Sequence, residues 1–337
     1  MQQPLILDER LTTPHLQPDR RPPRSANEPV ALTPPMMDAV YLAHAFAEAD
    51  RPVLLYGETG SGKTHFGEYI HRLSGRAGGF HPFSMGTEPP QLVADKLFGH
   101  IEGAFTGARR LRAGLIATAG TGTLLLDDFQ TLELSVQKQV YQVLDRKVYF
   151  AVGSDRPVSM VCRVILAMTE DPDMLMSKGL LEPDLRYRFA MNDIRIPPLR
   201  ERRPEIPYLA RQALDACPTN VAPGGPTKFH RAALALLCEA DYRGNVRQLI
   251  GVVERAYLLA RAAGRDVIRP EDLKVDLPSL KYRQHGDREE NRWVVERMLA
   301  LTGGNVKAAA ERLGVNRKTI SAVRNSEVRR KGDSGSQ

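Results

Sequence analysis

One uninterrupted stretch of the sequence fits a phosphate-binding loop. The pattern G-x-x-x-x-G-K-[ST] is matched by Gly57, Glu58, Thr59, Gly60, Ser61, Gly62, Lys63 and Thr64. The apolar, β-prone run Val53–Tyr56 precedes it, and Phe66, Ile70 and Leu73 follow at helical spacing. This order of strand, glycine loop and helix is the local structure that the motif requires.

The chemistry of such a loop follows from its residues. Glycines let backbone N–H groups close around phosphate oxygens, and the helix that follows adds partial positive charge at its N-terminus. Lys63 is predicted to reach the β and γ phosphates of ATP, and the Thr64 hydroxyl to ligate Mg²⁺. A glycine-rich turn without a ligand is the alternative, and the flanking pattern favours nucleotide binding.

Composition sets wider limits. A chain of 337 residues with 42% hydrophobic content can form two or three domains, and its net charge of +7 suits an anionic partner or a solvated basic surface. The three cysteines lack metal-ligand spacing, so reduced thiols are expected. Without an apolar run near the ~20 residues of a membrane span, or a signal-peptide core, we expect a soluble cytoplasmic protein with no membrane partner.

The chain divides into segments of different pattern. Residues 1–30 are rich in proline and arginine and are predicted to form a disordered tail, too short for a sensory domain. Regulation is therefore expected to come from a partner protein or from controlled expression. Over residues 31–203, β-like runs alternate with helical stretches, at 80–85, 123–126, 161–168 and 191–196. This alternation predicts an α/β fold with a parallel sheet covered on both faces.

The second half of the chain reads as helical. Residues 204–277 show helical patterns without strands and are predicted to form a separate helical subdomain. Residues 278–290 are polar and unpatterned, and we interpret them as a linker. Residues 291–330 form a last, basic helical element.

The run 123–126 ends in two carboxylates, Asp127 and Asp128. In P-loop ATPases the first such acid holds Mg²⁺ and the second activates the attacking water. The alternative is a strand that ends in a polar turn. Arginines cluster around the last predicted strand, and at least one is expected to reach the γ-phosphate of a neighbouring subunit. They are Arg186, Arg188, Arg200, Arg202 and Arg203, most of which are expected to be surface charge.

Residues 97–108 contain a glycine-flanked aromatic. Phe105 is predicted to lie at an exposed loop tip, where it either contacts a partner or serves as an ordinary buried anchor. The segment of interest consists of Gly103, Ala104, Phe105, Thr106, Gly107 and Ala108.

The C-terminal segment has the pattern of a helix-turn-helix. Helices are predicted over 292–301, 306–313 and 316–324, separated by Gly303-Gly304 and by a turn at Gly314. A three-helix bundle with a solvated basic face is the alternative. The side chains predicted to contact base edges and phosphates of double-stranded DNA are Asn316, Arg317, Lys318, Thr319, Ser321 and Arg324.

The hexapeptide 103–108 resembles the signature loop of the bacterial enhancer-binding activators of sigma-54 RNA polymerase, a branch of the AAA+ ATPases. The segments 97–100, 197–202 and 244–249 also match, and the likeness runs from about 32 to 331. It implies a five-stranded sheet with a helical lid, an ATP-binding ring, usually a hexamer, and a Fis-like DNA-binding end. It also implies that Phe105 and Thr106 engage sigma-54, that Arg247 is the nucleotide-sensing arginine of the lid, and that Arg188 is the trans-acting finger.

The chain departs from the family pattern at several positions. Thr64, Asp128, Thr169 and Glu182 stand where the family usually has glutamate, glutamate, a sensor asparagine and a finger arginine, and no restraining asparagine is evident in 80–87. An aspartate is shorter than a glutamate, and misplacement by about 1 Å can cost about 10²-fold in rate. The alternative is thus an ATP- and DNA-binding subunit with impaired hydrolysis, in a mixed ring with a paralogous partner. Another AAA+ class, such as a helicase loader, is disfavoured by the intact loop.

Overall fold

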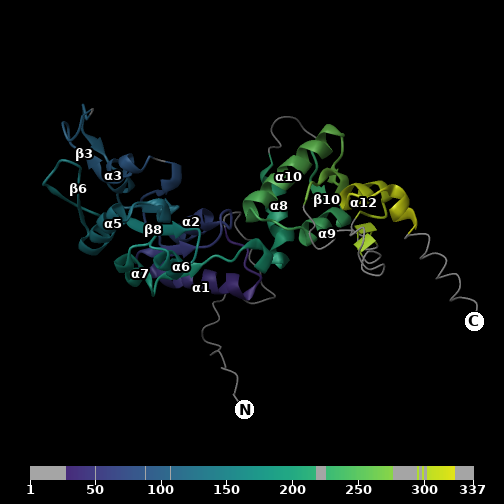
Figure 1. Ribbon diagram of the computed structural model, residues 1–337, viewed down its shortest axis with the longest axis horizontal. Coiled ribbons are helices and arrows are strands. Elements are labelled where there is room, and N and C mark those ends of the chain that lie inside the picture. Colours follow the sequence, from purple (N-terminus) through teal and green to yellow (C-terminus); the bar gives the residue numbers. More distant parts are fainter. Residues whose placement is uncertain are drawn as a thin grey trace, which may run out of the picture.

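The computed structural model describes residues 28–49, 51–87, 89–106, 108–217, 225–275, 294–295, 298–299 and 302–322. An α/β core lies at one end, the helical lid follows, and the C-terminal helices lie beyond the lid (Figure 1). Among the described residues, no helix combines the length and the apolar character needed to cross a bilayer. The predicted linker 278–290 and nearly all of the predicted tail lie outside the described residues.

The core is built on a five-stranded parallel sheet of order β2-β5-β8-β1-β9. Its strands are β1 (Val53–Tyr56), β2 (Phe80–Ser84), β5 (Thr123–Asp127), β8 (Arg163–Met168) and β9 (Asp193–Arg195). Every residue of β8, the central strand, is buried, as expected for a strand covered on both faces. The predicted fold class is confirmed.

Helices cover both faces of the sheet. On one face, Phe66 and Ile70 pack with Leu55, and on the other, Val140 and Leu144 pack with Leu54. Successive residues of β1 thus point to opposite layers, as the pleat of a strand requires. The core helices are α1 (Pro34–Glu48), α2 (Lys63–Leu73), α3 (Pro90–Phe98), α4 (Leu115–Ala119), α5 (Leu134–Arg146), α6 (Pro172–Ser177) and α7 (Pro183–Phe189), with short 3-10 turns η2 (Met85–Thr87), η3 (Phe129–Thr131), η4 (Leu199–Glu201) and η5 (Arg203–Glu205).

Two small hairpins project from the core, and the sequence patterns did not predict them. One pairs β3 (Gly99–His100) with β4 (Arg112–Ala113), and the other pairs β6 (Val148–Phe150) with β7 (Pro157–Ser159). They lie side by side, because the backbone N–H of Val152 donates to the carbonyl of Gly99 (2.8 Å) and the N–H of Ile101 donates to the carbonyl of Val152 (3.1 Å). The loop between β3 and β4 therefore rests on the turn between β6 and β7 (Figure 1).

The lid contains α8 (Ile206–Ala216), α9 (Arg231–Glu239) and α10 (Asn245–Ala262), with the 3-10 turn η6 (Pro270–Asp272). The prediction of a lid without strands is wrong in one detail. Strands β10 (Lys228–Phe229) and β11 (Val267–Ile268) form a two-stranded parallel sheet. Each is two residues long, too short for a periodicity of two to be read from the sequence.

The C-terminal helices pack directly on the lid. Helix α12 (Val306–Leu313) has the predicted bounds, and residues 317–322 are helical within the predicted third helix. Val295, Ala309 and Ile320 belong to the same hydrophobic cluster as Leu236 of the lid. The C-terminal element is thus continuous with the lid core in this structure.

A partly buried arginine joins these two parts. The guanidinium of Arg312 donates to the carbonyl of Leu273 (2.6 Å) and to that of Pro270, and burial lowers the pKa of Arg312 to about 10. We expect Arg312→Ala to destabilise the lid and C-terminal helices by about 1–3 kcal/mol, since two carbonyls lose their donor. Urea unfolding of the whole chain measures this.

The control for that prediction is Arg317→Ala, an exposed arginine of the next helix. Its removal should change the free energy of unfolding by no more than about 0.5 kcal/mol. Equal effects of the two substitutions would show that Arg312 does not fasten the C-terminal helices to the lid.

Candidate nucleotide-binding site

A pocket of about 560 Å³ opens between the core and the lid. Its apolar wall includes Val30, Met36, Ile196 and Leu209, which come from the segment before α1, from α1, from the residue after β9 and from α8. The predicted site residues that line it are Thr59, Gly60, Ser61, Gly62, Lys63, Thr64, Asp127, Asp128 and Arg247. The pocket thus combines an apolar wall with a phosphate-type loop, two carboxylates and a lid arginine. Gly57, Glu58, Thr169 and Arg188 do not line it.

The phosphate loop needs glycine at the positions where the motif has it. Gly57, Gly60 and Gly62 have φ values of +154°, +74° and +105°, in the region that favours glycine. A Cβ on Gly60 would lie 2.3 Å from the carbonyl oxygen of Gly244 in the lid. The loop and the lid backbone are therefore in direct contact, which only a residue without a side chain permits.

Lys63 is folded back onto the loop. Its ammonium donates to the carbonyls of Gly57 (2.8 Å) and Glu58 (3.4 Å), and the residue is only 6% exposed. Burial lowers the pKa of Lys63, with Asp127 and Asp128 opposing that shift. A phosphate oxygen would be a stronger acceptor than these carbonyls, because it carries a negative charge that attracts the ammonium directly.

Two further observations fit a nucleotide and its metal ion. The hydroxyl of Ser61 lies buried in the pocket wall and finds no hydrogen-bond partner among the described residues. The hydroxyl of Thr64 donates to the carboxylate of Asp127 (3.2 Å). Within the described residues, no three His, Cys, Asp or Glu side chains form a metal cluster. The site instead offers one hydroxyl and one carboxylate. This small number of oxygen ligands suits Mg²⁺, which takes its other ligands from phosphates and water.

Asp128 is held by a residue that the sequence analysis did not identify. It follows β5 in the left-handed conformation (φ +56°), and the hydroxyl of Ser84 donates to its carboxylate (3.3 Å). Ser84 ends β2 and pairs in register with Asp127, so its position follows from the strand order. Ser84 thus occupies the restraining position for which no asparagine was found.

Thr169 follows β8 but has no contact with the pocket. Its hydroxyl accepts a hydrogen bond from the amide nitrogen of Gln130 (3.0 Å), and Gln130 lies in η3, directly after Asp128. Thr169 is therefore linked to Asp128 indirectly, because the 3-10 turn η3 that begins after Asp128 carries the Gln130 that bonds to Thr169.

The arginines of α7 are engaged elsewhere on the core. Arg188 pairs with Asp145 (2.7 Å) and donates to the carbonyl of Leu144 (2.8 Å). Arg186 forms a two-point contact with Asp173 (2.6 and 3.0 Å). Neither lines the pocket of its own chain, so a trans-acting role for Arg188 stays a prediction.

Arg200 and Arg202, expected among the surface charges, support the phosphate loop. Arg202 is buried, donates to the carbonyl of Ser61 and pairs with the buried Glu205 (3.5 Å). Glu205 in turn accepts from the hydroxyl of Thr33 (3.1 Å), ahead of α1. Arg200 pairs with Glu58 on the other side of the loop.

The segment 103–108 forms a tight loop between β3 and β4. The N–H of Gly103 donates to the carbonyl of Ala108 (2.8 Å), and Phe105 and Thr106 are exposed, Phe105 to 42%. The ring of Phe105 also lies edge-on to His100 with centroids 5.1 Å apart, a packing partner that the sequence did not reveal. Gly107 lies outside the described residues.

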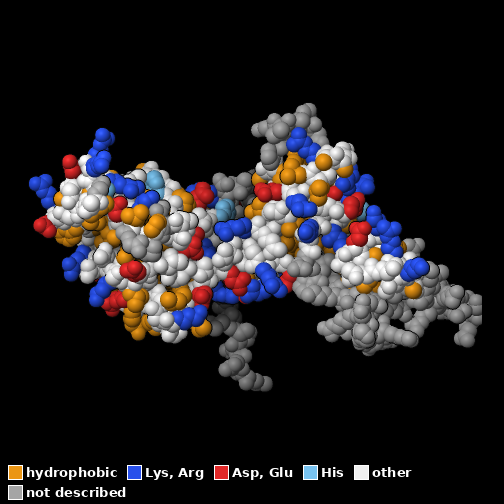
Figure 2. Space-filling model, turned by 45° about the horizontal axis from the view of Figure 1, so that its top comes forward, with side chains coloured by type: hydrophobic (Ala, Val, Ile, Leu, Met, Phe, Trp, Pro, Cys, Tyr) orange, Lys and Arg blue, Asp and Glu red, His pale blue; other side chains and the backbone are white. Residues whose placement is uncertain are grey.

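The candidate DNA-contacting residues lie at the C-terminal end. Asn316, Arg317 and Lys318 are exposed and Thr319 and Ser321 are half-buried, whereas Arg324 lies outside the described residues. The side chain of Asn316 accepts from the N–H of Lys318 (3.0 Å), so it also caps the last helix. Basic side chains are spread over both lobes of the molecule (Figure 2), so net charge alone does not mark one interface.

Three family models match consecutive parts of the chain. The sigma-54 interaction domain matches residues 30–195, the AAA+ ATPase lid domain matches 200–291, and the bacterial regulatory protein, Fis family, matches 289–322.

Curated relatives match over most of the chain. A limonene hydroxylase of Geobacillus stearothermophilus is 32% identical over 90% of this chain and 57% of its own length. The transcriptional regulatory protein GlrR of Escherichia coli (strain K12) is 32% identical over 86% of this chain and 65% of its own length. The DNA-binding transcriptional regulator NtrC of Proteus hauseri is 30% identical over 94% of this chain and 74% of its own length. The chain thus spans less than two thirds of the first two relatives.

Among solved structures, NtrX from Brucella abortus has a TM-score of 0.63 at 23% identity, over 89% of this chain and 69% of that one. At this identity the likeness concerns the fold alone. Taken with the matched domains and with NtrC, it agrees with the architecture described above. The chain belongs to the family of bacterial transcriptional regulators that carry a sigma-54 interaction domain, an AAA+ lid and a Fis-family helix-turn-helix.

Proposed function

We propose that this protein is a cytoplasmic, ATP-driven transcriptional activator that binds upstream DNA and remodels sigma-54 RNA polymerase so that the promoter opens. The observation that carries the proposal is the pocket, which brings Lys63, Thr64, Asp127 and Asp128 together beneath Arg247. The same core presents the exposed loop 103–108 on a separate hairpin. Membership of the sigma-54 activator family supports the coupling of the two.

ATP and Mg²⁺ have a residue set that fits them. The loop 57–64 would cradle the phosphates, with Lys63 on the β and γ groups and Arg247 sensing the nucleotide from the lid. Thr64 and Asp127 would hold Mg²⁺, which neutralises phosphate charge when bound. Asp128, oriented by Ser84, would accept the proton of the attacking water, and Thr169 would couple to it through Gln130. NtrX, which shares the fold, has been crystallised with ADP and with ATP.

Self-association into a ring, with a hexamer as the expected size, would complete the site. Arg188 of the neighbouring subunit would then reach the γ-phosphate. Of its two present partners, Asp145 is 53% exposed, and ion pairs at the surface contribute only about 0–1 kcal/mol. Releasing Arg188 for a trans contact would therefore cost mainly its hydrogen bond to the carbonyl of Leu144.

DNA binding is assigned to the last two described helices. We expect Arg317→Ala to weaken binding to duplex DNA by about tenfold, because one good arginine contact is worth about 1–3 kcal/mol. If the contact is to a phosphate, the slope of log affinity against log salt concentration should also become smaller by about one. Fluorescence anisotropy with the target duplex at several salt concentrations measures both.

The matched control is Arg255→Ala, which removes the same charge from an exposed position of α10 in the lid. Unchanged DNA affinity of the Arg317 variant would remove Arg317 from the interface. An equal loss in both variants would mean that only net charge matters.

The experiment that tests the proposal is steady-state ATP hydrolysis over a series of protein concentrations, beside Lys63→Ala. A Lys63-dependent rate that rises steeply with concentration is the expected result, because the finger comes from a second subunit. ATP binding without Lys63-dependent turnover would instead support a hydrolysis-impaired subunit that needs a paralogous or regulatory partner. Asp128, Thr169 and Glu182 favour that second candidate, since each departs from the family pattern.

A further inference from the structure

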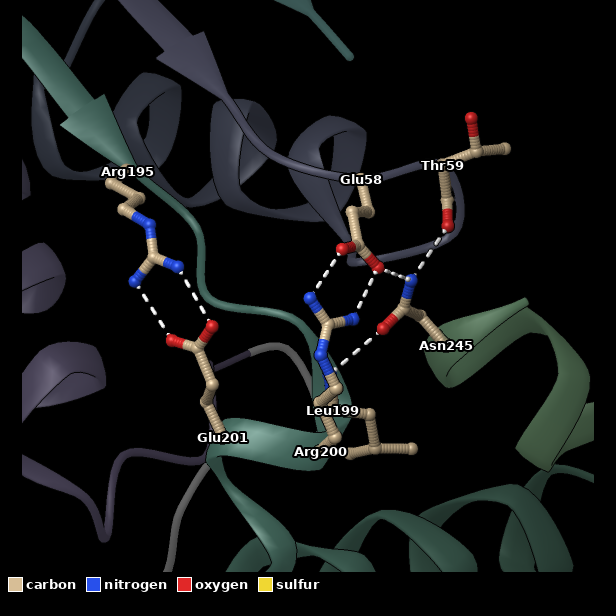
Figure 3. Close-up of polar contacts among 7 residues, drawn as sticks. All are labelled: Glu58, Thr59, Arg195, Leu199, Arg200, Glu201 and Asn245. Atoms are coloured by element: carbon tan, nitrogen blue, oxygen red, sulfur yellow. Dashed lines mark hydrogen bonds and ion pairs between the residues drawn. The ribbon is translucent and has the colours of Figure 1, made fainter. Parts of the chain in front are cut away.

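A three-part contact joins the phosphate loop to the lid (Figure 3). The amide nitrogen of Asn245 donates to the carboxylate of Glu58 (3.1 Å) and to the carbonyl of Thr59 (3.0 Å). The amide oxygen of Asn245 accepts from the N–H of Leu199 (2.8 Å). One side chain thus connects the loop, the 3-10 turn η4 and the first residue of α10.

The position of Asn245 is unusual in two respects. It is fully buried (0% exposed), and its backbone is left-handed (φ +52°), a conformation in which asparagine is several-fold enriched over other residues with a side chain. This turn brings the start of α10 onto the loop, where the N–H of Arg247 donates to the carbonyl of Gly60 (3.3 Å). Arg247 is therefore placed over the pocket by the residue two positions before it.

Glu58 has a second partner on the core side. Arg200 holds both of its carboxylate oxygens, at 2.8 and 2.6 Å, and this hydrogen-bonded pair lowers the pKa of Glu58. The two side chains are 54% and 42% exposed, so the pair should contribute little to global stability. Its two-point geometry instead fixes the orientation of the carboxylate that Asn245 contacts.

We propose that Glu58, Arg200 and Asn245 form a latch that positions α10, and with it Arg247, against the phosphate loop. These are positioning residues that act through Arg247, and the inference rests on the proposed binding of ATP in this pocket. Lys63 also contacts the carbonyl of Glu58. A phosphate that draws Lys63 away from that carbonyl changes the backbone segment that carries Glu58. Because Glu58 contacts Asn245, the position of α10 in the lid then depends on whether the phosphate is bound.

The chain offers a matched control pair beside the latch (Figure 3). Arg195 and Glu201 form the same two-point contact, at 2.8 and 2.8 Å. That pair joins β9 to η4, and among the described residues its side chains form hydrogen bonds with each other and not with the phosphate loop or the lid. Arg195→Gln therefore removes an equivalent two-point ion pair while every hydrogen bond of the latch remains.

The first test uses the nucleotide-free protein. Hydrogen exchange of the segment 245–250 should be about tenfold faster in Asn245→Gly and in Arg200→Gln than in the wild type, and unchanged in Arg195→Gln. Glycine retains the left-handed backbone, and the exposed Arg200 provides a second variant that does not disturb the core. If the segment 245–250 exchanges at the wild-type rate in both latch variants, the proposal is overturned.

The second test is a double-mutant cycle on ATP affinity, measured with a fluorescent ATP analogue. Arg247→Ala should weaken binding about tenfold in the wild type and hardly at all in Asn245→Gly, because Arg247 is then no longer positioned. The same tenfold loss in both backgrounds would overturn the latch. If the wild type itself does not bind the analogue while the exchange results hold, the proposed ATP site is wrong and the contact between loop and lid stands as a positioning device for another ligand.

Discussion

Thr106→Ala is expected to abolish promoter opening while ATP hydrolysis continues at the wild-type rate. Thr106 is exposed on the loop between β3 and β4 and does not line the nucleotide pocket. The substitution removes the hydroxyl that we propose contacts sigma-54, without disturbing the backbone contact between Gly103 and Ala108. If Thr106 is one of the few residues that dominate this contact, its truncation costs about 2 kcal/mol or more, roughly 30-fold. Open-complex formation and hydrolysis, assayed on the same preparation, measure the two effects.

The control is Thr121→Ala, an exposed threonine two residues before β5, away from the hairpin. It should leave both activities unchanged. Normal promoter opening by the Thr106 variant would exclude Thr106 from the sigma-54 contact. Loss of hydrolysis together with opening would place Thr106 in ring assembly instead.

The structure gives Phe105 a support that sharpens this prediction. Its ring lies edge-on to His100, whose imidazole pairs with Asp95, and Arg112 approaches the same carboxylate (3.5 Å). An aromatic edge-to-face contact is worth about 0.5–1.5 kcal/mol. The loop therefore has a defined resting position, so substitutions at its tip can be interpreted as contact losses.

Locally encoded features were predicted closely. β1 has the predicted bounds Val53–Tyr56, because a short buried run directly precedes a motif with fixed backbone requirements. α12 also has its predicted bounds. Asn305 caps its N-terminus by accepting from the N–H of Ala308 (3.1 Å), and Gly314 ends it at φ +64°. Both signals lie within a few residues of the elements they delimit.

Contacts between distant segments could not be predicted from one sequence. Ser84 reaches Asp128 only because β2 pairs with β5 in a particular register. Asn245 contacts Glu58 across 187 positions, and nothing in its local pattern indicates burial in a left-handed turn. The turn of the hairpin β6–β7 likewise bonds to Gly99 and Ile101, just before the loop 103–108, through backbone hydrogen bonds that leave no side-chain periodicity.

These distant contacts change how the departures from the family pattern are interpreted. A shorter carboxylate at position 128 is expected to reach less far toward the attacking water. However, the left-handed backbone of Asp128 and the hydroxyl of Ser84 place it at the pocket wall beside Asp127. The carboxylate of Asp128 thus lies in the pocket wall and is held there by Ser84, as the proposed role of general base requires.

Asp128→Asn is expected to lower ATP turnover by about 10²–10⁴-fold, the range for loss of a general base, with ATP affinity unchanged. Asparagine has the same shape, tolerates the left-handed backbone and can still accept from Ser84, so the fold of the site should persist. Turnover under saturating ATP and the affinity for a fluorescent ATP analogue separate chemistry from binding.

The comparison of Asp128→Asn with wild type also decides between the two functions proposed for the chain. A large drop in turnover requires that the wild-type carboxylate already works, as a self-sufficient activator needs. Wild-type turnover as slow as that of the variant would mean that the reach of Asp128 is insufficient, and the chain would then act as an ATP-binding subunit beside a catalytic partner. Asp128→Glu distinguishes the causes. One added methylene should raise turnover if reach is limiting, and should lower it if the contact with Ser84 sets the geometry.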